Sequence, residues 1–255
     1  MTAMNKLWEQ LKFDGKRLVF RNPSFLIMSL GMPAFFYWLF TKLFTNPATN
    51  NREFAGSYLG SMMVYSLLIT LLMGMSTALI RDRNEGLTVF LKLNHHRLDN
   101  YYASFLLWNT LKNFMAMGIL GLVAAYLNAI TLDPVQWLSL LGLILVGQIP
   151  IMLLAGLLAN VKRQETLGML MNLVTFPLAI VSGLWWPLET MPEWVQNIGR
   201  HLPTYFLNRT IGQVINHAKI NWSSVVGISE WILIMALVTA GVAQLFTKRS
   251  SAINA

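Results

Sequence analysis

The stretch FAGSYLGSMMVYSLLITLLMGMSTALI, residues 54–80, contains no Asp, Glu, Lys or Arg. An α-helix needs about 20 apolar residues to cross a hydrocarbon core of about 30 Å. Because lipid cannot satisfy unpaired backbone polar groups, an apolar run of this length has to be helical; the strands of a membrane barrel would be shorter and would alternate in polarity. Residues 54–80 therefore predict a membrane-spanning helix.

Similar charge-free runs recur along the chain, at 22–41, 113–132, 134–161, 166–188 and 231–247. The last run reaches spanning length only if it continues through Glu230 into the uncharged residues before it. The whole chain is 55% hydrophobic and 12% charged, whereas soluble domains carry about 25% charged residues. We expect a single all-α membrane domain over residues 1–255, with six spans at about 24–44, 57–80, 103–130, 137–160, 167–188 and 223–246.

The chain has a net charge of +8, and its basic residues cluster in alternate segments between the predicted spans. Thirteen of the 19 basic residues fall before the first predicted span, between the second and third, between the fourth and fifth, or after the sixth. These segments lie on one side of a six-span chain, so the positive-inside rule places both termini in the cytoplasm of a cell with this protein in its plasma or inner membrane. Nucleic acid is not expected as a partner.

Three segments outside the spans are too apolar for solvated loops. Residues 4–21 interleave apolar and basic side chains, which predicts an N-terminal amphipathic helix at the membrane interface. Residues 81–101 predict a short cytoplasmic interfacial helix. Residues 189–222 are broken by Pro192 and Pro203 and predict short helices that dip into the outer interface.

Catalytic motifs are missing from the sequence. No phosphate-binding G-x-x-x-x-G-K-[ST] loop occurs, and the chain has no cysteine. The adjacent pair His95-His96 points to opposite sides of a helix and has no carboxylate cluster beside it. We expect no catalytic residue, no metal site and no enzymatic activity in this chain.

Two ionisable residues fall within predicted spans. Lys112 lies in the third and Glu230 in the sixth, and intramembrane charge suggests a functional role because it is costly. They are candidates for a substrate path. Alternatively, Lys112 extends its ammonium to the interface, and Glu230 marks the true start of the last span.

Two regions resemble the exporter permeases of the ABC type 2 family. After the second span, Arg81-Asp82-Arg83-Asn84-Glu85-Gly86-Leu87-Thr88 resembles the family's E-R-E-x-G-T segment, with Leu87 inserted before the threonine. The second region resembles the family's F-x-S-G-x-x-x-P-x-x-x-x-P-x-W … x-P-x-x-Y pattern, on Phe176-Pro177, Ser182-Gly183, Pro187, Met191-Pro192-Glu193-Trp194 and Leu202-Pro203-Thr204-Tyr205. With six spans and the amphipathic start, the resemblance covers essentially the whole chain.

The resemblance assigns roles to these regions. It implies a cytoplasmic coupling helix after the second span that contacts an ATPase, with contributions from Arg83, Glu85, Gly86, Thr88, Phe90, Leu93, Lys162 and Arg163. It also implies outer re-entrant helices between the fifth and sixth spans, marked by Gly183, Pro187, Pro192, Trp194, Pro203 and Tyr205.

The resemblance further implies an exporter of a hydrophobic or amphipathic substrate, such as a drug, lipid, peptide or glycan. The permease would form a dimer, either homodimer or heterodimer, in membrane lipid, on two ATP-binding cassette ATPase subunits. ATP and Mg²⁺ would bind to those ATPase subunits, and no cofactor to this chain. A secondary transporter or channel is the alternative, although such proteins usually show more charge at mid-membrane or inverted repeats. A membrane-embedded enzyme is a third possibility, although no nucleophile, base and metal ligand converge in the sequence.

Overall fold

The computed structural model describes residues 3–20, 23–43, 51–93 and 98–253, and these ranges contain helices and short connections but no strand. Six helices within them are long and apolar enough to cross a membrane. They are α2 (Pro23–Leu43), the continuous second span (Arg52–Asn84), α6 (Leu98–Asn128), α7 (Pro134–Leu158), α8 (Gln164–Val181) and the Trp222–Leu245 part of α11 (Trp222–Ile253). The prediction of an all-α chain with six candidate spans is confirmed.

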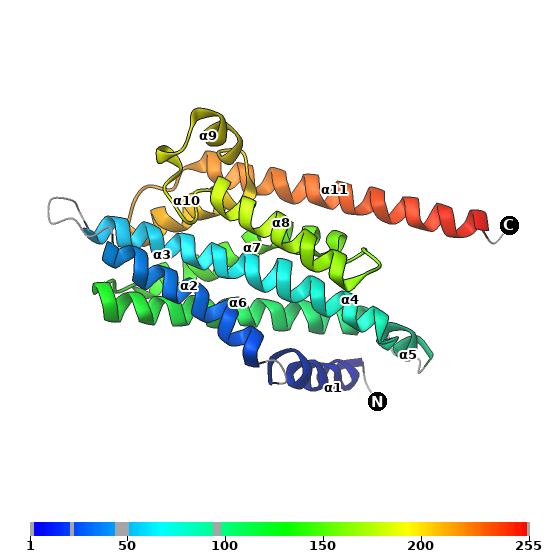
Figure 1. The fold of residues 1–255 in the computed structure, drawn as a ribbon. Helices are drawn as coiled ribbons and strands as arrows, with labels where there is room; N and C mark the ends of the chain where they lie inside the picture. The colour runs from blue at the N-terminus through cyan, green and yellow to red at the C-terminus, as the bar shows by residue number, and fades with distance from the viewer. Residues whose placement is uncertain (1–2, 21–22, 44–50, 94–97, 254–255) are drawn as a thin grey trace.

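The long helices run side by side, and the shorter ones gather at the two ends of the bundle (Figure 1). One end, called here the α5 end, carries α1 (Ala3–Gly15), α5 (Leu87–Leu93) and the end of α11. The opposite end, called the α10 end, carries α9 (Glu193–Gly199) and α10 (Pro203–Ile215). Six crossings thus return the described part of the chain to the end at which it starts.

The second span is the centre of the bundle. It is built from α3 (Asn51–Leu68), a π-helical segment η2 (Ile69–Met75) and α4 (Ser76–Asn84), and every residue from 58 to 72 is buried. Its α3 segment packs on α2, α6 and α10, and η2 packs on α7 and α8. The Ser76 hydroxyl donates a hydrogen bond to the Ala155 carbonyl at 2.9 Å. Such bonds hold helices together in lipid, where burial of apolar surface gives little driving force.

The fifth span is shorter than expected, because α8 ends at Val181 and not near residue 188. Gly183 adopts a φ of +73°, a left-handed conformation that glycine tolerates and that commonly terminates helices. The amide of Gly183 donates to the Ile180 carbonyl at 3.0 Å, and that of Leu184 to the Ala179 carbonyl at 3.0 Å. These bonds close the helix seven residues before the predicted end.

The N-terminal segment forms α1 followed by a π-helical turn, η1 (Lys16–Phe20). Its inward side is polar: Gln10 and Asp14 are buried, whereas the large aromatic rings of Trp8 and Phe13 are exposed. The indole nitrogen of Trp108 on α6 donates to the Leu11 carbonyl at 2.8 Å, which helps to hold α1 against α6. Polar contacts therefore contribute to the docking of α1, together with the close packing of the Trp108 ring on Gly15.

Candidate functional site

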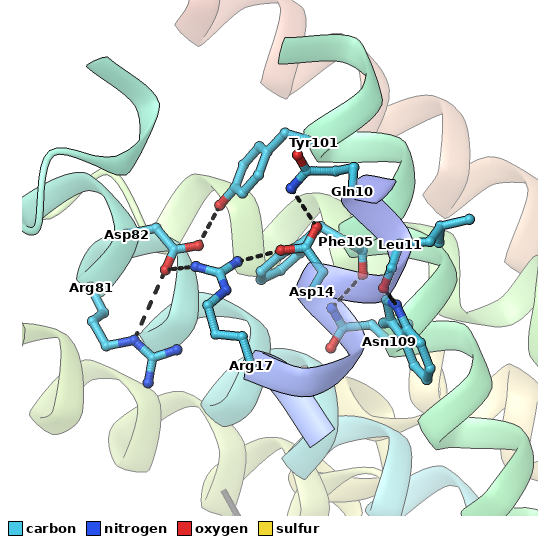
Figure 2. A network of polar contacts seen from close by, with 10 residues as sticks. Gln10, Leu11, Asp14, Arg17, Arg81, Asp82, Tyr101, Phe105 and Asn109 are labelled. Atoms are coloured by element: carbon cyan, nitrogen blue, oxygen red, sulfur yellow. Dashed lines mark hydrogen bonds and ion pairs between the residues drawn. The ribbon is translucent and has the colours of Figure 1, made fainter. Parts of the chain in front are cut away.

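A buried ionic network joins four elements at the α5 end (Figure 2). The Arg17 guanidinium on η1 forms an ion pair with Asp82 near the end of α4, and a second one with Asp14 on α1, at 2.9 Å. The Tyr101 hydroxyl at the start of α6 donates to the other oxygen of Asp82 at 2.7 Å. Both carboxylates are 0% exposed, so they need these partners.

The charges within this network are largely compensated. Gln10 donates to the second oxygen of Asp14 at 2.8 Å, and the Arg81 Nε atom lies 3.9 Å from Asp82. Burial lowers the pKa of the Arg17 guanidinium, but the hydrogen bond to Asp82 and the attraction of both carboxylates outweigh this effect, and the pKa is raised overall. Arg17 therefore remains charged and links α1 to the end of α4, and Tyr101 joins α6 to the same carboxylate of Asp82.

The sequence alone does not predict this network. The spacing of Asp14 and Arg17 was visible, since residues three apart share one face of a helix. The partnership with Asp82 was not, because 65 residues separate it from Arg17.

A tight corner connects α4 to α5. The Glu85 amide donates to the Arg81 carbonyl at 2.8 Å and caps α4, and Gly86 then takes a φ of +73° that lets the chain reverse direction. α5 begins at the next residue, Leu87. Glu85 and Arg83 are exposed, and their side chains form no hydrogen bond or ion pair within the part of the chain that the structure describes. The structure thus places the predicted residues at the surface of one corner without pairing them.

α5 presents an exposed apolar ridge, defined here as Val89, Phe90 and Leu93. Phe90 is 61% exposed and Leu93 is 75% exposed, whereas Leu91 is buried on the opposite side and Thr88 is half-buried. The helix packs on α4 and α6, so it lies between the second and third spans.

The remaining candidates at this end, Lys162 and Arg163, are exposed in the turn between α7 and α8. His95 and His96 lie outside the described residues. Within the described ranges, no group of three His, Asp or Glu side chains could hold a metal ion.

A cleft of about 720 Å³ opens at the α10 end, between α3, α10 and the turn that follows α8. Three of the predicted outer residues line it: Gly183, Pro187 and Tyr205. A hydrogen bond from Ser61 to the Asn208 side-chain oxygen, at 3.1 Å, links α3 to α10 beside it. Charged, amide and aromatic groups share the lining of the cleft.

The other outer residues start helices or lie at the surface. Pro192 immediately precedes α9 and Pro203 is the first residue of α10, as their fixed backbone angle favours. Trp194 on α9 is exposed.

The two intramembrane candidates lie in different surroundings. Lys112 is buried on α6 and lines a small cavity at the α5 end. Glu230 is exposed on α11, which begins at Trp222, so this residue lies inside the helix and not at its start. The two side chains form no ion pair with each other.

Six helices long and apolar enough to span a bilayer, with a short apolar helix after the second, are typical of a multi-pass membrane protein. The sequence profile of the ABC-2 type transporter family matches residues 12–215, and the chain belongs to this family. A protein of Bacillus subtilis (strain 168), named "Putative transport permease YvfS", is 27% identical over 236 residues, which cover 92% of this chain and 96% of that protein. The predicted family is confirmed, and it describes a transporter that works with an ABC ATPase.

Proposed function

We propose that this chain is the permease subunit of an ATP-driven exporter that moves a hydrophobic or amphipathic substrate out across the cell membrane. The substrate would be a drug, lipid, peptide or glycan. A separate cytoplasmic ATPase subunit binds ATP and Mg²⁺, and two permease copies form the pathway. Both termini, and with them the α5 end, face the cytoplasm.

The observation that carries this proposal is the apolar ridge of α5. Full burial of a Val, Leu or Phe side chain stabilises a protein by about 1.5–3 kcal/mol, so exposing three of them is unfavourable unless a partner or lipid covers them. A groove on the ATPase would cover them. Polar Arg83 and Glu85 lie directly before the ridge and supply charged contacts at its edge.

The surroundings of α5 explain how motion would reach the spans. α5 contacts α4 and α6, and the ionic network ties the same two helices to α1. A force applied to the ridge would therefore displace the second and third spans together with α1. The second span also borders the cleft at the α10 end, so closure of the ATPase would alter the far side of the bundle.

Co-purification tests the proposal. We expect a tagged full-length chain, isolated from native membranes in mild detergent, to carry an ATPase that contains a phosphate-binding loop. The double variant Phe90→Ser/Leu93→Ser should lose this ATPase and still insert into the membrane. The control is Trp8→Ser, which removes a large exposed apolar side chain from α1 at the same end of the bundle.

Retention of the ATPase by the double variant, or equal loss in Trp8→Ser, would argue that the ridge lies on lipid headgroups. If no ATPase accompanies the wild-type chain, the exporter proposal itself fails.

A further inference from the structure

A cavity of about 150 Å³ lies beside the ionic network, between η1, α2, η2, α4 and α6. Its lining divides into two kinds of residue. The cationic part consists of Arg17, Arg81 and Lys112, and the apolar part includes Leu18, Phe25 and Met73. The volume is large enough for several water molecules or for one compact polar group.

The cationic charge around this cavity exceeds the anionic charge. Asp14 and Asp82 are the carboxylates of the network, and Arg17 and Arg81 share them. Lys112 is 8% exposed and forms no hydrogen bond or ion pair with any residue that the structure describes. The Arg81 side chain is 35% exposed, so the buried charge without a partner is the Lys112 ammonium, which is costly unless an anion accompanies it.

The cavity lies in the half of α6 that is nearer the α5 end. Lys112 lies 11 residues beyond Tyr101 on α6, which corresponds to about 16 Å along the helix axis. Side chains on a helix lean toward its N-terminus, so Lys112 leans toward the α5 end, where Arg17 and Arg81 lie. On the apolar side, the Phe25 ring packs so closely on Gly74 that an added Cβ would lie 2.6 Å from ring atoms.

We infer that this cavity binds the phosphate of an anionic phospholipid from the leaflet at the α5 end. Lys112 and Arg81 pair with the phosphate oxygens, and the glycerol and first acyl carbons lie along Phe25 and Met73. Ammonium and guanidinium groups form strong charge-assisted hydrogen bonds with phosphate. A free phosphate ion would satisfy the same cations but would leave the apolar lining without a partner.

Lipid titration followed by native mass spectrometry tests this inference on the full chain in dodecyl maltoside. The probes are dioctanoyl phosphatidylglycerol, dioctanoyl phosphatidylcholine and inorganic phosphate. We expect wild-type protein to bind one phosphatidylglycerol per chain in preference to phosphatidylcholine. Lys112→Met should weaken this binding about tenfold, as expected for the loss of one charged hydrogen bond, and Lys112→Arg should retain it.

Lys16→Met is the matched control, because Lys16 is an exposed cation on η1 that does not line the cavity. Its phosphatidylglycerol affinity should equal that of wild type. If Lys112→Met does not yield monodisperse protein, Arg81→Gln decides, with an expected loss of several-fold.

Displacement of phosphatidylglycerol by millimolar inorganic phosphate would support an anion site but would identify its occupant as a soluble phosphate ion and not a phospholipid. The inference is overturned by wild-type affinity in the cavity variants, by an equal loss in Lys16→Met, or by an absence of both lipid preference and phosphate binding.

Discussion

Replacement of Arg17 with Gln is expected to release α1 from the bundle without unfolding the spans. Arg17 is the bridge between Asp14 and Asp82, both of which are 0% exposed. Glutamine keeps a polar side chain but is shorter than arginine, and it removes the charge that compensates the two carboxylates. The bundle core does not depend on this bridge, because residues 58–72 are buried among other helices.

The free-energy cost of this substitution depends on the hydrogen-bond partners that each carboxylate retains. Breaking a buried ion pair costs about 3–5 kcal/mol when one charge is left without its partner. Asp82 retains the Tyr101 hydroxyl and Asp14 retains Gln10, and the Arg17 side chain is 15% exposed, so water also reaches the site. We therefore take the lower limit of about 3 kcal/mol, which corresponds to a change of about a hundredfold in the opening equilibrium of α1.

Hydrogen exchange in lipid nanodiscs measures this equilibrium. In Arg17→Gln, the amides of α1 should exchange about a hundredfold faster, whereas those of α3 should be unchanged. Lys16→Gln, an exposed neighbour on η1, is the control and should leave α1 protected. Unchanged exchange of α1 in Arg17→Gln, or equal acceleration in both variants, would refute the argument that the network holds α1 in place.

Three further predictions concern other parts of the chain. Glu85→Ala should leave membrane insertion intact but weaken ATPase association or uncouple hydrolysis from export. The reason is that the partner of Glu85 on the ATPase would be left unpaired at the interface, which costs about 2–5 kcal/mol. Transport and ATPase binding are measured in the same preparation. The natural chain has no cysteine, so Trp194→Cys should react with an impermeant thiol reagent added outside intact cells, and Phe90→Cys should not. Gly183→Ala should destabilise the turn after α8 by about 1–2 kcal/mol, seen as a lower thermal midpoint, because its φ is +73°.

Each of these predictions has a result that would contradict it. Wild-type transport and ATPase binding in Glu85→Ala would reject the coupling role. Labelling of Phe90→Cys but not of Trp194→Cys would invert the proposed topology. An unchanged midpoint in Gly183→Ala, compared with Gly168→Ala as a helical control in open space, would mean that alanine adopts the left-handed turn without strain.

The number of spans was predictable because charge-free runs such as residues 54–80 are a property of the sequence alone. The helix starts at Pro192 and Pro203 were predictable for a similar reason, since proline fixes its own backbone angle. The end of α8 was not predictable from apolarity. Residues 182–188 are nearly as apolar as the helix before them, and the left-handed conformation of Gly183 decides the boundary.

The ionic network was beyond sequence reasoning because its pairing is long-range. An amphipathic α1 suggested apolar residues facing the membrane and basic residues facing headgroups. The inward face in fact carries Gln10 and Asp14, and Arg17 beside them pairs with the fully buried Asp82 of another helix. A charge on α1 can be assigned to the surface or the interior only when its partner is known.

The most direct test of the central claim, that α5 docks on an ATPase, is site-specific photo-crosslinking in native membranes. Benzoylphenylalanine is introduced in place of Phe90 on the ridge and, as a control, in place of Tyr126, which is exposed on the membrane-spanning α6. We predict an adduct with a protein that contains a phosphate-binding ATPase loop from position 90, and none from position 126. Lipid adducts alone at position 90, or the same ATPase adduct from both positions, would contradict the proposal.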